Sequence, residues 1–301
     1  MTLRHLRAGA AVAAALLALT ACGGGSDAPA AADGKVAVVA STNVWGSVVQ
    51  AVGGDAVTVH SIIDDPSADP HSYESKPADV AALAKAKVVV FNGGGYDDFF
   101  TKLIADSGDS GAKQVDAFGL SGKADGTNEH VWYDLPTVKK VADKVAEELS
   151  AAAPDKKDAF TANAAKFDQQ VDSLAASVAK LGTDHPGSKV VVTEPVPHYL
   201  LEAAGVTDAT PTEFSEAIEN ETDVPVAALT AATDLITGKQ VTALVNNTQT
   251  ENSVTQQLVS QAGTAGIPVV GVTETLPAGV SGYLDWMTKQ VDALSTALSK
   301  K

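Results

Sequence analysis

The sequence predicts an α/β protein made of two Rossmann-like lobes with parallel sheets, joined by one long rigid helix. In the first and last parts of the 301-residue chain, short β-branched apolar runs alternate with helical patterns. Continuous apolar strands between helices are typical of a parallel sheet covered on both faces. Between these regions lies one long amphipathic run. We therefore expect an N-terminal lobe at 35–154, a connecting helix at 155–182 and a C-terminal lobe at 183–301.

The elements of the first lobe are predicted from their composition and from the period of their apolar residues. Its expected strands are 35–41, 56–63, 87–93 and the weaker 114–118, and its expected helices are 45–52, 77–86 and 135–152. In the connecting helix, one stripe at near 3.6-residue spacing comprises Phe160, Ala164, Phe167, Val171, Leu174 and Val178. In the second lobe we expect strands at 189–194, 241–247 and 267–274, and helices at 199–204, 224–237, 251–265 and 282–298.

The chain begins with the features of an export signal. Residues 1–21 have a basic start and an apolar stretch that is too short to span a bilayer. The residues Leu-Thr-Ala directly before Cys22 resemble the lipobox of bacterial lipoproteins, which implies cleavage before Cys22 and lipid attachment to it. The alternative is an ordinary secretory signal with a chance cysteine. Residues 22–34 are small and flexible, and we expect them to form a tether.

Composition limits the function further. Cys22 is the only cysteine, so the exported domain must be stabilised by packing rather than by an internal disulfide. The formal net charge of −16 disfavours nucleic acid and anionic membrane as partners. An acidic domain outside the membrane is suited to attracting cations.

Histidines and strand-end acids supply the candidate chemistry. Of six histidines, three lie in the signal, a strand pattern and a Pro/Gly loop, namely His5, His60 and His185. His71 and His130 follow β segments of the first lobe, and Glu194 and Glu274 end strands of the second. Ligands bind at the carboxyl ends of parallel strands, so these four side chains could face one another across a cleft. Zinc, manganese and iron accept such a mixed nitrogen and oxygen set. The alternative is a set of ordinary solvent-facing polar residues.

Four stretches make a resemblance specific. They are DPHSYESKPADVAALAKAKVVVFNGGG from Asp69, NEHVWYDLP from Asn128, TEPVPHYLLEAAG from Thr193 and VTETLPAGVSGYLDWM from Val272. In this order they resemble the zinc/manganese receptor family, the metal-binding lipoproteins of ABC importers known as cluster A-I. The resemblance implies four metal ligands, which are His71, His130, Glu194 and Glu274.

The same resemblance implies a function. It describes a monomeric, lipid-anchored receptor on the outer face of the cytoplasmic membrane or in the periplasm, and not an enzyme. The receptor would deliver Mn²⁺ or Zn²⁺, with Fe²⁺ third, to an ABC permease and its cytoplasmic ATPase. Two imidazoles with two carboxylates favour manganese, whereas the Irving–Williams order favours zinc.

Several alternatives stay open at this point. His198 is a rival to Glu194 as the third ligand, and Glu74 is a candidate to orient a nearby histidine by a hydrogen bond. A second functional class is an exported metal-dependent hydrolase that uses the same site, and a third is a surface adhesin with a structural metal. The sequence contains no HExxH, G-x-S-x-G or phosphate-loop motif, which disfavours the enzyme.

Overall fold

Two four-stranded parallel sheets organise the computed structural model, which describes residues 34–66, 68–108 and 111–300. The predicted signal peptide at 1–21, the lipidation site Cys22 and nearly all of the tether lie outside the described residues. In the first sheet the order is β2 (Val57–Ile63), β1 (Val36–Thr42), β3 (Val88–Phe91), β4 (Lys113–Asp116). In the second it is β6 (Thr207–Asp208), β5 (Lys189–Val192), β7 (Ala243–Asn247), β8 (Val269–Val272).

The two sheets therefore have the same topology, although the sequence shows no repeat. All seven predicted strands are present, with ends that differ from the prediction by at most two residues, and only the two-residue β6 was not expected. In each sheet the strand order reverses beside the first strand, so a crevice forms at the carboxyl ends of the central strands. These strand ends position the site described below.

The helices agree with the prediction except for three short ones. The first lobe contains α1 (Asn43–Gly53), α2 (Pro77–Leu83), α3 (Asp98–Asp106), α4 (Ala117–Ser121) and α5 (Leu135–Ala152). The second contains α7 (His198–Ala203), α8 (Thr212–Glu219), α9 (Val226–Thr237), α10 (Ser253–Ala265) and α11 (Tyr283–Leu298). Sequence periodicity did not predict α3, α4 or α8. No helix among the described residues is both long and apolar enough to cross a membrane.

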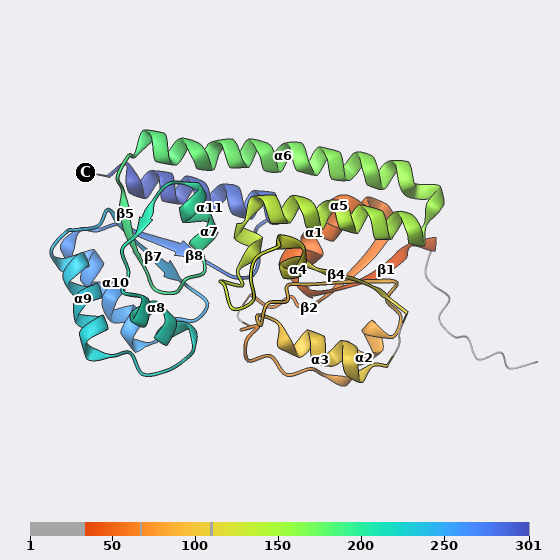
Figure 1. Cartoon of the computed structure of the whole chain (residues 1–301), viewed down its shortest axis with the longest axis horizontal. Coiled ribbons are helices and arrows are strands. Elements are labelled where there is room, and N and C mark those ends of the chain that lie inside the picture. The colour runs from red at the N-terminus through yellow and green to blue at the C-terminus, as the bar shows by residue number, and fades with distance from the viewer. Residues whose placement is uncertain (1–33, 67, 109–110, 301) are drawn as a thin grey trace, which may run out of the picture. The chain divides into compact units, whose positions relative to one another are not determined.

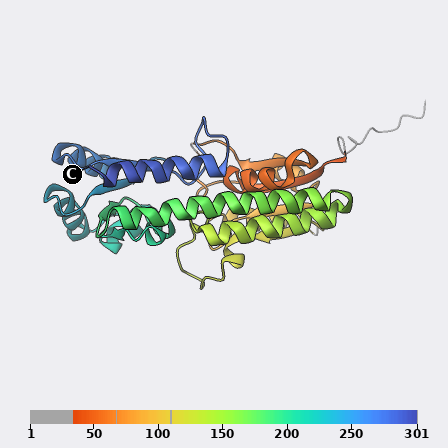
Figure 2. The ribbon, with the colours of Figure 1, turned by 90° about the horizontal axis from the view of Figure 1, so that it is seen from above.

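The connecting helix α6 spans Lys157–Asp184, 28 residues, or about 42 Å at 1.5 Å per residue. It begins two residues later than predicted because Pro154–Lys156 form a 3₁₀ turn. The predicted apolar stripe is buried throughout. Figures 1 and 2 show α6 running beside both sheets, with α11 and α1 placed nearly end to end along it.

A single apolar core extends across both lobes. It contains Val38 and Val88 from the first sheet, Val190 and Val245 from the second, and Phe167 from α6. The described residues from Gly34 onward form one compact unit, so the proposed division at 154 and 182 remains a prediction. Wide separation of the lobes would expose this shared core to water, which is unfavourable. We therefore expect small tilting motions rather than wide opening.

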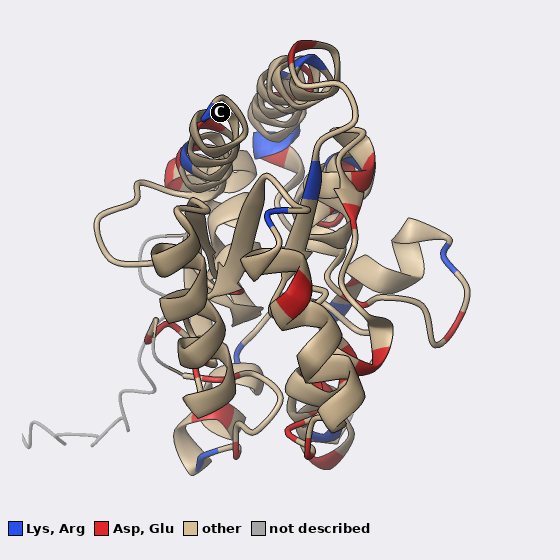
Figure 3. Ribbon diagram, turned by 90° about the vertical axis from the view of Figure 1, so that its left-hand side faces the viewer, with Lys and Arg blue, Asp and Glu red and all other residues tan. Residues whose placement is uncertain are grey.

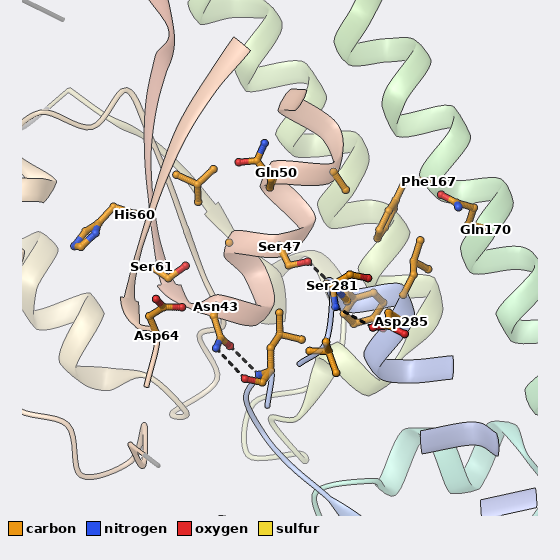
Figure 4. Close-up of a pocket in the computed structure, with 18 of the residues that line it drawn as sticks. Asn43, Ser47, Gln50, His60, Ser61, Asp64, Phe167, Gln170, Ser281 and Asp285 are labelled. Carbon is orange, nitrogen blue, oxygen red and sulfur yellow. Dashed lines mark hydrogen bonds between the residues drawn. The ribbon is translucent and has the colours of Figure 1, made fainter. Parts of the chain in front are cut away.

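The chain returns to the first lobe after β8. The amide nitrogen of Leu276 donates to Asn43 Oδ1 (2.9 Å), and Asn43 Nδ2 donates to the Leu276 carbonyl (3.2 Å). Further on, the Tyr283 amide donates to Ser47 Oγ (2.8 Å). This crossing segment borders a cavity of about 840 Å³ beside α1 and α6, shown in Figure 4. The segment that follows Glu274 is thus attached to the first lobe.

Charged residues are spread over many elements. Figure 3 shows acidic positions on helices and loops, with fewer basic positions between them. The ion pairs are mostly at the surface, such as Lys144 with Glu148 (2.7 Å) and Lys289 with Asp285 (2.9 Å). Exposed pairs of this kind contribute little to stability. Two buried charged side chains, Glu194 and Glu274, lie instead at the strand ends.

Candidate metal centre

The strand ends of the two sheets bring the predicted side chains together. His71 lies in the loop after β2, and Glu194 and Glu274 are each the second residue after a strand, β5 and β8 respectively. These three side chains line one cavity of about 560 Å³. His71 Nε2 lies 3.8 Å from Glu274 Oε2. Residues from the two lobes therefore meet in one place, as the strand-end argument predicted.

His130 is completely buried and precisely oriented. Its Nδ1 lies 3.1 Å from Asn128 Oδ1, which also accepts a hydrogen bond from the His130 amide (3.0 Å). Asn128 Nδ2 donates to the Pro195 carbonyl (2.8 Å), so the amide oxygen of Asn128 must be the atom that faces the ring. Nδ1 therefore carries a proton in either charge state of the ring, and Nε2 points toward Glu219, where a metal can bind it once its own proton is displaced.

His71 is held by the Asp-Pro turn that precedes it. Asp69 Oδ1 accepts from the His71 amide (2.9 Å), and Asp69 Oδ2 accepts from Ser72 Oγ (3.0 Å). The His71 ring packs edge-on against Tyr96 with centroids 5.0 Å apart, and its side chain stays 30% exposed. His71 is therefore the open side of the site.

Aromatic rings form the wall on the first-lobe side. Trp132 and Tyr96 lie 5.1 Å and 5.9 Å from the His130 ring, centroid to centroid. The loop that carries Tyr96 is fixed by the buried Asp97, which accepts from the amides of Asn92 (2.7 Å) and Gly93 (2.8 Å). Burial raises the pKa of Asp97 to about 6, although these backbone bonds oppose the shift. The rings exclude water and limit the positions of both imidazoles.

On the second-lobe side, one amide links the two strand-end acids. Asn247 Nδ2 donates to Glu194 Oε2 (2.5 Å) and to Glu274 Oε1 (2.8 Å), and Thr250 Oγ1 donates to Glu194 Oε1. Gln249 Oε1 accepts from the Glu274 amide (2.5 Å), while its Nε2 donates to the Pro66 carbonyl of the first lobe (3.0 Å). Asn247 and Gln249 thus position the carboxylates, and sequence reasoning predicted neither.

Burial and mutual charge determine the ionisation of the centre. Burial raises the pKa of Glu194 to about 8 and also raises the pKa of Glu274. Burial alone would lower the pKa of His130, but the carboxylates of Glu219 and Glu274 outweigh it and raise that pKa to about 9. Several acids in a dry site are unfavourable for one another, and a divalent cation would relieve that repulsion.

We expect Asn247→Asp to destabilise the metal-free protein by about 3 kcal/mol at pH 9, because a donor shared by two buried carboxylates becomes a third carboxylate. Urea unfolding in the presence of a chelator measures this loss. The loss should shrink as the pH falls through about 8, the raised pKa of Glu194, because the protonated Glu194 carboxyl can then donate a hydrogen bond to the introduced carboxylate.

The matched control is Asn252→Asp at the exposed N-cap of α10, where Asn and Asp are equivalent caps. It should leave the free energy of unfolding almost unchanged. Equal stability of the Asn247→Asp protein and the original would contradict the role assigned to this amide.

Glu219 is a carboxylate at the site that the sequence did not suggest. It is the last residue of α8, and its Oε1 lies 3.2 Å from His130 Nε2 and 3.6 Å from His71 Nε2. One ligand atom from each of His71, Glu129, His130 and Glu219 lies within 4.8 Å of the others. The only sequence signal was an acid in the last turn of a helix too short to be predicted.

The two alternative site residues lie elsewhere. His198 is exposed at the start of α7 and lines a neighbouring cavity of about 620 Å³, which Glu129 and Glu219 also border. His198 is not among the residues that line the cavity of His71, whereas Glu194 is. Glu74 is exposed, and Asn128, not Glu74, orients His130.

Two parallel α/β lobes with a histidine and carboxylate cluster at their facing strand ends are the architecture of a bilobed solute-binding protein. A family model described as "ZnuA: Zinc-uptake complex component A periplasmic" matches residues 38–297, so the chain belongs to this family. Its members are components of uptake systems, and the chain is a binding protein, not an enzyme.

Individual relatives agree with this assignment. The "Manganese-binding lipoprotein MntA" of Halalkalibacterium halodurans is 25% identical over 298 residues, covering 95% of this chain and 96% of the relative. The "Manganese ABC transporter substrate-binding lipoprotein PsaA" of Streptococcus mitis is 28% identical over 64% of this chain and 67% of the relative. The solved periplasmic zinc-binding protein TroA of Treponema pallidum superposes with a TM-score of 0.75 at 20% identity, covering 89% of this chain and all of TroA.

Proposed function

We propose that this chain is the receptor of an ABC-type metal importer, which captures Mn²⁺ or Zn²⁺ between its lobes outside the cytoplasmic membrane. The observation that carries the proposal is the convergence of imidazole and carboxylate atoms from both lobes. His130 Nε2 and Glu274 Oε2 are buried without a hydrogen-bond partner among the described residues. Buried polar atoms without partners are costly, and a cation would satisfy them.

The proposed ligands are His71, His130, Glu194 and Glu274. Two neutral imidazoles and two carboxylates give a charge of −2, which a divalent cargo would neutralise. Because carboxylates can bind through both oxygens, the set also accommodates coordination numbers above four, which suits manganese. Zinc binds tightly to almost any such set, and Fe²⁺ is the third candidate.

The family and the relatives support the rest of the proposal, which concerns the membrane anchor, the location and the partners. Two relatives are named as lipoproteins, one of them as the substrate-binding lipoprotein of a manganese ABC transporter, which supports lipid attachment at Cys22 and a position on the outer face of the membrane or in the periplasm. We propose that the protein acts as a monomer and docks both lobes on a permease driven by a cytoplasmic ATPase. The shared core across the lobes supports release by tilting and loop rearrangement.

Competition titration of the purified, metal-stripped protein with Mn²⁺ and Zn²⁺ tests the proposal. Single alanine changes at His71, His130, Glu194 and Glu274 should each weaken binding, and His198→Ala should not. If His198→Ala loses binding and Glu194→Ala binds normally, then His198 and not Glu194 is the third ligand. If none of the changes alters affinity, the receptor function is wrong.

A further inference from the structure

The geometry points to Glu219 as a fifth protein ligand that shifts the selectivity of the centre from Zn²⁺ toward Mn²⁺. This inference rests on the proposed function, because it concerns the same cargo. It adds a third carboxylate, supplied by the end of α8 rather than by a strand end.

The position of Glu219 is the first argument. Its Oε1 lies 3.2 Å from His130 Nε2 and 3.6 Å from His71 Nε2. Ligands bound at about 2.1 Å from one metal in tetrahedral to octahedral geometry are separated by about 3.0–3.4 Å. The distance to His130 falls within this range and the distance to His71 is slightly longer, and the ligand atoms of all three residues lie within 4.8 Å of one another, so a small closure would place them around one ion. Glu194 makes no comparably short approach to either imidazole that the structure records.

Hydrogen bonding gives the second argument. Both carboxylate oxygens of Glu219 are buried and lack a hydrogen-bond partner among the described residues, as does the completely buried His130 Nε2 that faces them. Both oxygens of Glu194, by contrast, accept hydrogen bonds from Asn247 and Thr250. The imidazoles of His71 and His130 face the Glu219 carboxylate, so this buried acid is costly unless a cation, either a protonated imidazole or a bound metal, pairs with it.

The backbone gives the third argument. Glu219 ends α8, where the helix dipole disfavours an acid. The helix closes with a Schellman motif, in which the Thr222 amide donates to the Ala217 carbonyl (2.8 Å) and the Glu221 amide to the Ile218 carbonyl (3.1 Å). Glu221 occupies the left-handed position at φ 51°, which glycine normally fills. The unfavourable helix dipole and the left-handed residue are thus two local energetic costs next to the Glu219 side chain. Such costs are typical of functional sites.

A fifth ligand changes which metal is favoured. Zn²⁺ prefers four ligands in a tetrahedron, so an additional carboxylate contributes little to its binding. Mn²⁺ accepts six mainly oxygen ligands and benefits from each carboxylate. Glu129 is a second acid near the two imidazoles, and it lines the cavity that His198 also lines. Glu219 is favoured as the ligand because its Oε1 lies close to Nε2 of both imidazoles.

The test is a pair of competition titrations, with Mn²⁺ alone and Zn²⁺ alone, on the metal-stripped full protein carrying Glu219→Gln or Glu219→Ala. We expect Mn²⁺ affinity to fall about 10-fold or more and Zn²⁺ affinity to fall clearly less, so that the Mn²⁺/Zn²⁺ affinity ratio decreases. The matched control is Glu216→Gln, an exposed acid one turn earlier on α8, which should leave both affinities unchanged.

Equal losses for both metals in the Glu219 variants would indicate a structural role and overturn the inference, as would no loss for either metal. His130→Ala separates this failure from failure of the function. If His130→Ala abolishes binding while Glu219→Gln has no effect, only the fifth ligand is wrong. If His130→Ala also binds normally, the receptor function itself fails.

Discussion

Replacing His130 by alanine is expected to lower the affinity for Mn²⁺ and Zn²⁺ by about 100-fold or more, because a ligand is lost outright and even partners that only orient ligands are worth 10- to 100-fold. His130 is completely buried, and Asn128 fixes the proton on the far nitrogen of its ring. No neighbouring histidine can substitute, since His198 lies on an exposed helix start. Isothermal titration with a competing chelator measures the change.

Two further variants serve as comparisons for the His130→Ala protein. Asn128→Ala should reduce affinity by a smaller factor, about 10-fold or more, because the imidazole remains but loses its orientation. His198→Ala should have no effect. Normal affinity in the His130→Ala protein would contradict the proposed centre.

Metal binding is expected to stabilise the folded protein by about 4 kcal/mol when free metal is at 1,000 times its Kd. For a chain of this size such a gain raises Tm by roughly 10 °C. The physical source is the relief of repulsion among Glu194, Glu219 and Glu274, together with new bonds between the lobes. Differential scanning calorimetry with and without Mn²⁺ measures the shift.

A chelator should reverse the shift completely. At that metal concentration the His130→Ala protein, with binding about 100-fold weaker, should keep at most about a third of the shift. An equal shift in both proteins would mean that the metal stabilises the chain somewhere other than at the strand ends.

Sequence patterns predicted the strands of both sheets well because most of them are continuous β-branched runs. Residues 189–192 and 88–91 are examples, since almost every side chain there is buried. By contrast, β6 has two exposed, polar residues and α8 has only eight, so neither carries enough period to be recognised. Helix α6 was predicted to within two residues because its stripe repeats over about five turns.

The site was predicted only as far as strand ends and motifs reach. His71, Glu194 and Glu274 stand at such positions and line one cavity. Glu219 stands at a helix end instead of a strand end, and its neighbours His71 and His130 are far away in sequence. No sequence pattern therefore pointed to it. The orienting amides of Asn128, Asn247 and Gln249 were also missed, since an amide has no distinctive pattern until its partners are placed in space.

The attachment of the crossing segment to α1 has a mechanical consequence. Glu274 is bonded through its amide to Gln249 of the second lobe, and two residues later Leu276 is bonded in both directions to Asn43 of the first. Any rotation of one lobe against the other therefore strains a two-residue stretch of backbone that begins at Glu274. When a permease tilts the lobes, we expect Glu274 to move before His71 or His130. The bond between Glu274 and the metal would then be the first to break.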